Sequence, residues 1–478
     1  MNQRSVYFFS ALILSVTAFF SAGYLHPDEH FQILEFAGLK LNLTAAGNLP
    51  WEFQYQMRPA IQPVMVVLVY RFFGLFGVPD PFFIAFILRL MTAAFSFLGM
   101  WLIYRVYENG IVNRILKKWF LFLSFFLWFV VFFNVRFSSG SWAGSAFIIA
   151  FAYLQYKKQK IRLTDFFLAG LILGFSFLFR FHSGFLILGM ISWMLVIKKE
   201  PAIRILFLCS GIFVVLGIGF LLDRWFYGEW TMTFWNYFQQ NLLLDKVSGF
   251  GRQAWWFYFK GVFFEAIPPF SLVYILSILL FCVFKRKDIL TWTLLPFVVV
   301  HFLIGHKEMR FLFPIAGFLP IIIIQSVDLL RQKWLPDLLQ KKAVRYFVKT
   351  FWAANLALLI IVAFSPADTE INLFKKIYRD YPSPTTLYVI NENPYRRALD
   401  IYFYKRKNLK IEVMDSSSLI RPLPGRICLV VTRNAKELKD LGIQKKLIYS
   451  SFPDWMKHFN FNHWIERTNF WYVYQLER

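Results

Sequence analysis

Long apolar runs are the feature that most constrains the fold of this chain. Eleven of them approach the length of about 20 residues that a helix needs to cross a bilayer, at 5–24, 81–104, 117–136, 140–156, 164–180, 183–198, 203–222, 264–284, 288–304, 311–330 and 348–365. With 58% hydrophobic and 17% charged residues, the composition excludes a single water-soluble domain and a disordered chain. The three cysteines lie far apart and have no metal-binding spacing. We therefore expect an all-α polytopic membrane protein.

Basic residues predict how the spans are oriented. The net charge of +24 gathers in short loops between apolar runs, which is typical of cytoplasmic loops and argues against nucleic acid as a partner. The clusters lie at 105–118, 157–162, 198–204, 285–287 and 331–349. Eleven spans after a cytoplasmic N-terminus place all of these clusters inside, if the first run is an anchor helix and not a cleaved signal. A crossing by the ambiguous stretch 60–77 would turn them outward, so we expect it to lie along the outer face.

This orientation leaves the long loops and the C-terminal tail outside. The predicted membrane domain, 1–365, exposes outer loops 25–80 and 223–262, and the tail 366–478 forms a separate extracytoplasmic domain. Short buried strands are expected at 386–390, 411–415 and 427–432, with helices at 394–404 and 435–441. Strands that alternate with helices predict a small α/β module with a parallel sheet.

The first outer loop contains the densest group of ionisable residues. Pro27 is expected to start a helix, which places Asp28 and Glu29 in a first turn that favours carboxylates. An α-helical spacing would put Asp28, Gln32 and Glu35 on one face. The acids could be inert helix-start residues. Their crowding with His26 at the membrane exit favours a partly desolvated carboxylate that acts as a general base.

A second group of charges predicts a phosphate site. His306, Lys307, Glu308 and Arg310 lie between two apolar spans on the outer side. The cations could simply extend to the membrane interface. Three cation-forming residues and one acid within five positions would also hold a phosphate, with Glu308 positioning a base. Two ionisable residues at span ends, Arg136 and Arg180, are candidates for the same site, because charged side chains within a membrane are usually functional.

The 223–262 loop is rich in aromatic, Asn and Asp residues, which form either an interfacial belt or a sugar site. Together the outer loops suit transfer of a sugar from a phosphate-bearing lipid to a polar acceptor. Cations would hold the leaving phosphate, and a carboxylate would deprotonate the acceptor hydroxyl.

Two motifs resemble a known family. His26-Pro-Asp-Glu-x-x-Gln-x-x-Glu35, followed by Trp51-Glu-Phe53 and Arg58, is similar to the start of the membrane mannosyltransferases that extend GPI anchors and the lipid-linked N-glycan precursor. His306-Lys-Glu-x-Arg-Phe-Leu-x-Pro314 resembles their second motif, and Asp223-x-Trp-Phe-Tyr-Gly228 resembles their long lumenal loop. The resemblance covers roughly residues 20–320, and its first motif is more similar to that of the mannosyltransferases that extend GPI anchors.

This resemblance implies a GT-C fold and inverting transfer of mannose from polyprenyl- or dolichyl-phosphate mannose to a glycolipid or lipid-linked glycan. It implies Asp28 as catalytic base, Glu29 as secondary acid, and no metal or other cofactor. The substrate-binding and phosphate-binding residues expected on both grounds are His26, Gln32, Glu35, Arg58, Arg136, Arg180, His306, Lys307, Glu308 and Arg310.

Short inner loops and the unmatched tail favour a compact bacterial member in the inner membrane, and the endoplasmic reticulum membrane is the alternative. A transporter or flippase of a lipid-linked glycan is the second hypothesis, although its ionisable residues would lie near the bilayer midplane in repeated halves. A scaffold without chemistry is the third, and it leaves the outer charge clusters unexplained.

Overall fold

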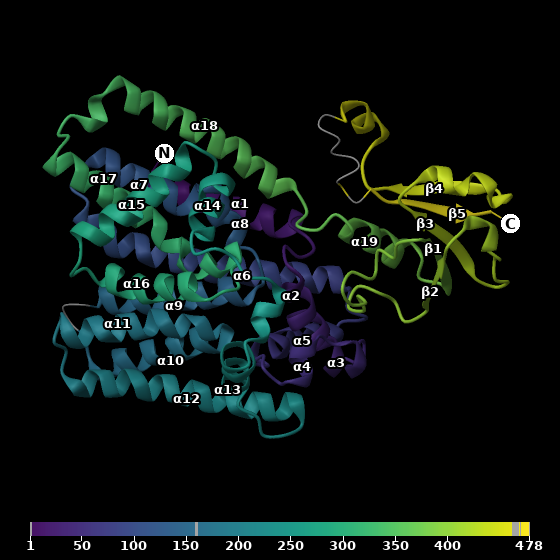
Figure 1. Cartoon of the computed structure of the whole chain (residues 1–478), viewed down its shortest axis with the longest axis horizontal. Helices are drawn as coiled ribbons and strands as arrows, with labels where there is room; N and C mark the ends of the chain where they lie inside the picture. Colours follow the sequence, from purple (N-terminus) through teal and green to yellow (C-terminus); the bar gives the residue numbers. More distant parts are fainter. Residues whose placement is uncertain (1, 158–160, 461–467, 469, 478) are drawn as a thin grey trace. The chain divides into compact units, whose positions relative to one another are not determined.

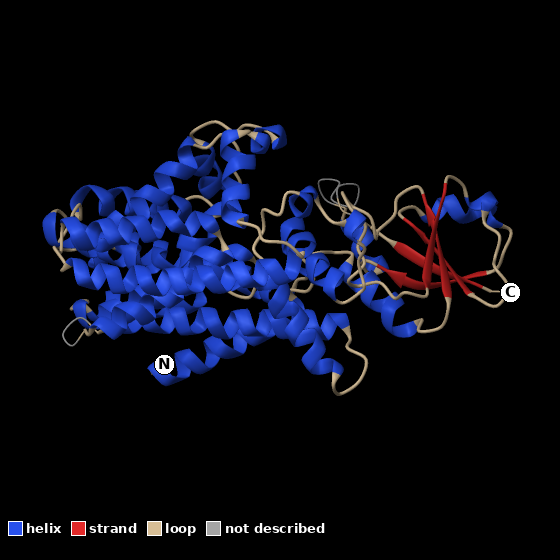
Figure 2. Cartoon of the chain, turned by 90° about the horizontal axis from the view of Figure 1, so that it is seen from below, coloured by secondary structure: helices blue, strands red, loops and turns tan. Residues whose placement is uncertain are grey.

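The structure is a computed structural model that describes residues 2–157, 161–460, 468 and 470–477. It divides into two compact units. We call them the helical unit (Met1–Phe20, Gln54–Val64 and Ile87–Ser365) and the mixed unit (Ser21–Phe53, Met65–Phe86 and Pro366–Arg478). Figure 2 shows the strands only in the C-terminal part of the chain. The predicted basic residues Lys158 and Lys160 lie outside the described residues.

Helices form most of the chain before residue 381. The α-helices are α1 (Gln3–Phe20), α2 (Pro27–Glu29), α3 (Phe36–Lys40), α4 (Trp51–Gln54), α5 (Ile61–Gly74), α6 (Pro81–Tyr107), α7 (Arg114–Phe126), α8 (Trp128–Phe133), α9 (Ser139–Tyr156), α10 (Leu163–Phe179), α11 (Gly184–Val196), α12 (Ala202–Tyr227), α13 (Thr233–Phe238), α14 (Phe257–Glu265), α15 (Phe270–Phe284), α16 (Ile289–Leu303), α17 (Leu319–Lys333), α18 (Lys342–Phe364) and α19 (Ile371–Asp380). Two other helical segments contribute to the site, the π-helix η1 (His30–Glu35) and the 3-10 helix η7 (Met309–Phe318).

Each predicted span coincides with one helix or with a pair of helices. Among the described residues, six helices are long and apolar enough to cross a membrane, and several others are apolar but shorter. The predicted span 264–284 is divided into α14 and α15 by a segment that contains Pro268 and Pro269, because proline lacks the N–H that continues a helix. The stretch 60–77 contains α5, which has 14 residues. The number of crossings and their direction stay predictions.

Glycine residues allow two helices of the helical unit to pack closely. α10 and α12 lie side by side (Figure 1). A Cβ atom on Gly170 would collide with the Leu208 carbonyl oxygen, and one on Gly211 would collide with the Phe167 carbonyl oxygen. Glycine at these positions brings the two backbones together, as in other helix pairs within membranes.

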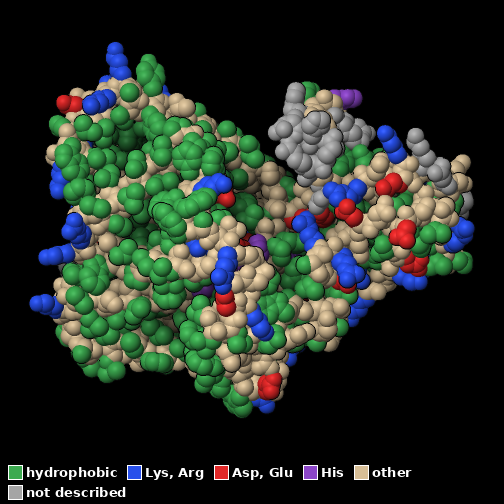
Figure 3. Space-filling view, viewed as in Figure 1, with side chains coloured by type: hydrophobic (Ala, Val, Ile, Leu, Met, Phe, Trp, Pro, Cys, Tyr) green, Lys and Arg blue, Asp and Glu red, His purple; other side chains and the backbone are tan. Residues whose placement is uncertain are grey.

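The basic loops lie at one end of the helical unit. Figure 1 shows the connections α11–α12, α15–α16 and α17–α18 at the same end of the bundle, on the left. Figure 3 shows Lys and Arg side chains along that edge and hydrophobic side chains over much of the adjoining surface. The connections that follow α10, α12 and α16 must therefore lie at the opposite end, and they carry the predicted cations.

The mixed unit contains a five-stranded sheet in the order β2-β1-β3-β5-β4. The strands are β1 (Thr385–Ile390), β2 (Leu409–Met414), β3 (Ile427–Thr432), β4 (Lys445–Ser450) and β5 (Tyr472–Leu476). β1 pairs in parallel with β2 and β3, which confirms the three predicted strands. β5 runs antiparallel to β3 and β4, so the sheet is mixed. The predicted helix 394–404 is wrong, because that stretch forms turns, whereas 435–441 forms a 3-10 helix.

Candidate active site

The first candidate segment starts a helix at Pro27, as the sequence predicts. The His26 ring caps this helix, because its Nδ1 accepts a hydrogen bond from the Asp28 N–H at 3.2 Å. Pro27 suits the first helical position, where an N–H would have no helical partner. The Asp28 side chain is 28% exposed, and its Oδ1 lies 3.5 Å from His26 Nδ1. Asp28 is therefore an accessible carboxylate in a first helical turn.

The segment that follows is a π-helix, which separates side chains that an α-helix would align. Hydrogen bonds in η1 run from i to i+5, so the expected common face of Asp28, Gln32 and Glu35 is not formed. Gln32 Nε2 donates to Glu52 Oε1 at 2.9 Å. The Glu35 carboxylate has no exposed surface and points into the mixed unit.

Glu29, which precedes the π-helix, and Glu35, which is its last residue, are both buried acids. Glu29 Oε2 accepts a hydrogen bond from the Leu25 N–H at 3.2 Å. Burial alone would raise the pKa of Glu35, but hydrogen bonds from His30, Phe403 and Thr44 hold it below its ordinary value. Both acids therefore differ from Asp28 in being enclosed by protein donors. Their predicted roles at the substrate stay predictions.

In the helical unit, cationic side chains surround the Phe311 ring. The guanidinium carbons of Arg180 and Arg310 lie 5.0 and 5.5 Å from its centroid. The His306 ring lies 6.1 Å from the same centroid. An aromatic face attracts cations, but two guanidinium groups beside one ring also repel each other. Arg180, which is distant in sequence from the other two, thus meets His306 and Arg310 at one ring, and these three predicted phosphate ligands form one cluster, which we call the cationic cluster.

Two other members of the second motif bind the protein itself. Glu308 pairs with both neighbouring cations: its Oε1 lies 2.9 Å from His306 Nε2, and its Oε2 accepts from Arg310 Nε. Lys307 Nζ donates to the carbonyl oxygens of Gln253 at 3.2 Å and Ile304 at 2.5 Å. Burial lowers the pKa of Lys307. Glu308 thus orients the two cations, and Lys307 holds the backbone of the loop.

Arg58 contacts residues of the 223–262 loop, which the sequence predicts to be either an interfacial belt or a sugar site. Its guanidinium carbon lies 5.3 Å from the Tyr237 ring centroid, and its carbonyl oxygen accepts from the Tyr227 hydroxyl at 2.7 Å. Asp223 Oδ1 accepts from the Ala60 N–H at 2.7 Å. Asn236 Nδ2 donates to the Gln56 carbonyl at 3.2 Å. Polar residues of the 223–262 loop therefore fix residues 56–60.

A cavity of about 380 Å³ adjoins the cationic cluster. Most of its lining is aromatic, and the polar side chains on its wall are His182, Tyr237, Asn241, His301 and His306. His182 Nε2 lies 2.8 Å from the Tyr237 hydroxyl, and the rings of His182 and His301 are 5.1 Å apart. The cavity can take a ligand with an apolar part and a few hydrogen-bonding groups.

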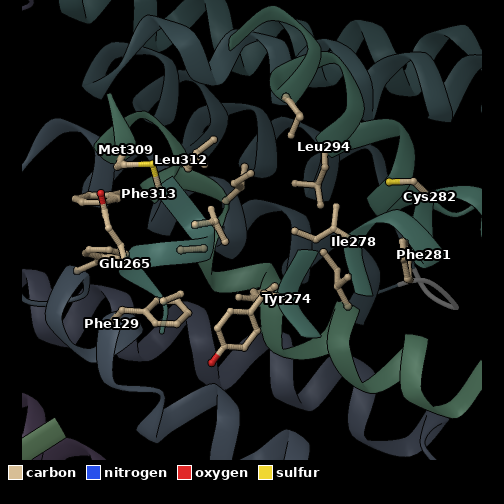
Figure 4. A pocket seen from close by; sticks show the side chains of 18 of the residues that line it. Phe129, Glu265, Tyr274, Ile278, Phe281, Cys282, Leu294, Met309, Leu312 and Phe313 are labelled. Carbon is tan, nitrogen blue, oxygen red and sulfur yellow. The ribbon is translucent and has the colours of Figure 1, made fainter. Parts of the chain in front are cut away.

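A second cavity, of about 220 Å³, lies on the other side of η7 (Figure 4). Its wall includes Phe129, Tyr274, Ile278, Leu294 and Phe313, with Glu265 as its carboxylate side chain. Phe311 of η7 lines the first cavity, whereas Met309, Leu312 and Phe313 line the second. Residues of one short helix therefore line both cavities, the first beside the cationic cluster and the second largely apolar.

The structure places Arg136 differently from the other predicted cations. Its side chain is buried, and its guanidinium carbon lies 6.0 Å from the Phe132 ring centroid. It lines neither of the two cavities described above. Its predicted contact with phosphate stays a prediction.

The sequence analysis missed three residues that the structure places at the first cavity. Phe311 is the ring around which the cations gather, Tyr237 contacts both Arg58 and His182, and His301 lies inside α16. A histidine within an apolar span was the available signal, but its partners are distant in sequence. Within the part of the chain that the structure describes, no three His, Cys, Asp or Glu side chains gather closely enough to hold a metal ion.

Comparison with solved structures gives the fold class. ArnT from Cupriavidus metallidurans, solved bound to undecaprenyl phosphate, superposes with a TM-score of 0.57 and 12% identity over 98% of this chain and 97% of that chain. The helical architecture and this likeness define a polytopic membrane protein with the GT-C fold and a small C-terminal sheet domain.

Sequence comparison gives the family. A sequence model of the Alg9-like mannosyltransferase family matches residues 5–406, so the chain belongs to that family. Mannosyltransferase APTG1 of Arabidopsis thaliana is 26% identical over 337 residues, which cover 68% of this chain and 58% of the relative. GPI alpha-1,2-mannosyltransferase 3 of Bos taurus is 25% identical over 315 residues, which cover 64% and 55%. The chain thus spans less than two thirds of the length of these relatives.

Proposed function

We propose that this protein transfers a mannosyl residue from a polyprenyl-phosphate sugar to a glycolipid or lipid-linked glycan, with inversion. The acceptor hydroxyl attacks the anomeric carbon of mannose, and the bond from that carbon to the phosphate oxygen breaks. The polyprenyl phosphate leaves with the electron pair, and Asp28 takes the proton of the hydroxyl. Family membership and the mannosyltransferase names of the relatives support this reaction.

The observation that carries the proposal is the cationic cluster at the first cavity. Arg180, Arg310 and His306 surround one ring beside a wall that is mostly aromatic. Arginine suits a leaving phosphate, because its planar guanidinium donates two parallel hydrogen bonds. A catalyst of this kind stabilises the charge that develops on the leaving oxygen. The cluster is therefore assigned the donor phosphate.

The apolar cavity is assigned the hydrocarbon chain of the donor. Met309, Leu312 and Phe313 of η7, the helix that also carries Arg310, line this cavity, and its wall is almost wholly apolar. A solved protein of the same fold is described with undecaprenyl phosphate bound, which makes a polyprenyl phosphate the donor to test first. The basic loops gather at one end of the helical unit, which supports a site on the extracytoplasmic or lumenal side of a bacterial inner membrane or, as the alternative, of the endoplasmic reticulum membrane.

A transfer assay tests the proposal. Membranes that contain the wild-type chain or Asp28→Asn would receive radiolabelled polyprenyl-phosphate mannose, and labelled glycolipid would be measured. Removal of a general base should slow transfer by about 10²- to 10⁴-fold. The matched control is Asp80→Asn, which removes another aspartate of the first outer region, paired with Arg379, and should leave transfer unchanged. Wild-type transfer by Asp28→Asn would remove Asp28 from the mechanism.

Arg310→Ala tests the phosphate site separately. Loss of a charged hydrogen bond costs about 1.5–3 kcal/mol, so the KM for the donor should rise about tenfold to a hundredfold.

Mass spectrometry of glycolipids from a deletion strain would identify the acceptor as the species that lacks one hexose. Movement of intact lipid-linked glycan without any sugar transfer would instead support a flippase.

A further inference from the structure

The C-terminal tail contacts the loop that carries Asp28 through a buried carboxylate. Glu35 Oε1 accepts hydrogen bonds from the backbone N–H groups of Tyr402 at 2.7 Å and Phe403 at 2.9 Å. His30 Nε2 lies 2.8 Å from the same oxygen, and the Thr44 hydroxyl donates to Oε2. Both Glu35 and His30 have side chains with no exposed surface. A carboxylate with donors from the loop and from the tail joins the two segments.

Aromatic rings strengthen the same junction. The His30 ring stacks on Tyr24 at 5.3 Å on one side and on Tyr404 of the tail at 5.5 Å. Tyr404 stacks in turn on Phe82 at 4.8 Å. The Asn48 side-chain amide donates to the Tyr402 hydroxyl at 3.1 Å. Residues 402–404 therefore touch the loop on both sides of Glu35.

A second junction lies before Asp28 in the sequence. The Ala22 carbonyl accepts from the N–H groups of Ala367 at 2.8 Å and Asp368 at 3.3 Å. Gly23 has a φ of 83°, and a Cβ there would collide with Asp368. Arg397 of the tail pairs with Asp368 and Glu370, and its guanidinium carbon lies 5.7 Å from the Tyr24 ring centroid.

The two junctions enclose the short helix that presents Asp28. α2 has three residues and continues into a π-helix, and such short irregular helices have little stability of their own. The tail holds the chain at residues 22–24 and again at 30–35. A catalytic carboxylate must stay within a fraction of an ångström of its working position, since a displacement of about 1 Å can cost about 10²-fold in rate.

We propose that the C-terminal domain positions Asp28, and that Glu35 is a positioning residue that joins the domain to the Asp28 loop and does not bind substrate. This inference rests on the proposed function, because it takes Asp28 to be the base. It gives the tail a role in the reaction and replaces the sequence-based prediction that Glu35 binds substrate.

The test uses the full-length protein in nanodiscs with two readouts, hydrogen exchange of amides 25–41 and mannosyl transfer. Glu35→Ala leaves the buried donors without an acceptor, so exchange should rise and kcat should fall by about tenfold or more. Glu35→Gln keeps an amide oxygen for the Tyr402 and Phe403 N–H groups, so it should restore kcat to within about threefold of wild type. The donor KM should stay within about twofold for both variants.

Asp80→Asn is the matched control. It removes the exposed pair between Asp80 and Arg379 of the tail, so both readouts should stay at their wild-type values. If Glu35→Ala does not fold, Arg397→Gln serves instead, because it leaves the buried carboxylate intact. Faster exchange at residues 22–30 and transfer slowed by about threefold would then support the proposal.

Three results would overturn the positioning role. The first is unchanged hydrogen exchange in Glu35→Ala or Arg397→Gln. The second is an equal loss of kcat in Glu35→Ala and Glu35→Gln together with a raised donor KM, and the third is an Asp80→Asn variant that behaves like Glu35→Ala. The exchange readout needs no activity. Failure of the proposed function would instead appear as wild-type transfer by Asp28→Asn, so the two failures are distinguishable.

Discussion

Asp223 is a buried carboxylate that joins two segments of the helical unit. Its side chain accepts from the Ala60 N–H and from the Thr233 hydroxyl at 2.8 Å. Asp223→Ala would leave both donors buried without an acceptor, at a cost of about 1–3 kcal/mol each. Asp223→Asn keeps an acceptor for the Ala60 N–H and should cost less. Thermal unfolding of both variants in detergent would check this order, and equal melting temperatures would contradict it.

Glu35 should make stability depend on pH in a defined direction. Its pKa in the folded protein lies below its ordinary value of 4.5. A group with a depressed folded pKa stabilises the fold above its unfolded pKa, and this contribution is lost as the pH falls through the folded pKa. The difference in melting temperature between wild type and Glu35→Gln should therefore be largest near about pH 7 and should decrease below about pH 4.5. A gap that stays constant in acid would show that the charge of Glu35 contributes nothing.

At the scale of elements, periodicity predicted the buried strands and apolar helices but not the irregular segments. β1 and β3 consist largely of buried apolar residues, and such runs are readable without tertiary knowledge. The π-helix η1 and the turns at 394–404 are different, because a side chain of η1 and backbone N–H groups of the turns pair with each other. Tyr402 and Phe403 donate to Glu35 across more than 360 residues, and no local pattern encodes that pairing.

The helix η7 and its apolar neighbour α15 yield a prediction about donor chain length. Ile278 of α15 lines the apolar cavity, so Ile278→Trp should fill part of its volume of about 220 Å³. If the donor chain occupies this cavity, the KM for a long-chain donor should rise about tenfold toward that of a short-chain donor. Leu276→Trp is the matched control on the same helix, since Leu276 is exposed and does not line the cavity. Equal effects of the two variants would exclude the cavity as the chain site.

At the scale of the whole molecule, the sequence correctly predicted a polytopic membrane protein, because apolar runs and basic loops can be recognised along the chain without knowledge of tertiary contacts. The site was predicted only in part, because it depends on which distant side chains meet. Arg180 was predicted from its place at a span end, and His306 and Arg310 were predicted from their compact motif between two spans; the three gather around one ring. Asp223 and Asn236 resembled sugar ligands in type, but they bind the backbone of residues 56–60.

The orientation of the chain in the membrane can be tested by labelling single cysteines in a variant whose Cys209, Cys282 and Cys428 are replaced by Ser. Ala46→Cys in the first outer loop and Leu244→Cys in the 223–262 loop are both exposed positions. The proposed mechanism requires both to react with an impermeant maleimide in intact cells, because the base and the cations must share a compartment. Lys287→Cys, in a basic loop at the opposite end of the helical unit, should react only after the membrane is opened, because Lys and Arg in short loops stay on the cytoplasmic side. Labelling of Ala46→Cys and Leu244→Cys from opposite sides would separate Asp28 from the cationic cluster, and a single reaction at one site would then be impossible.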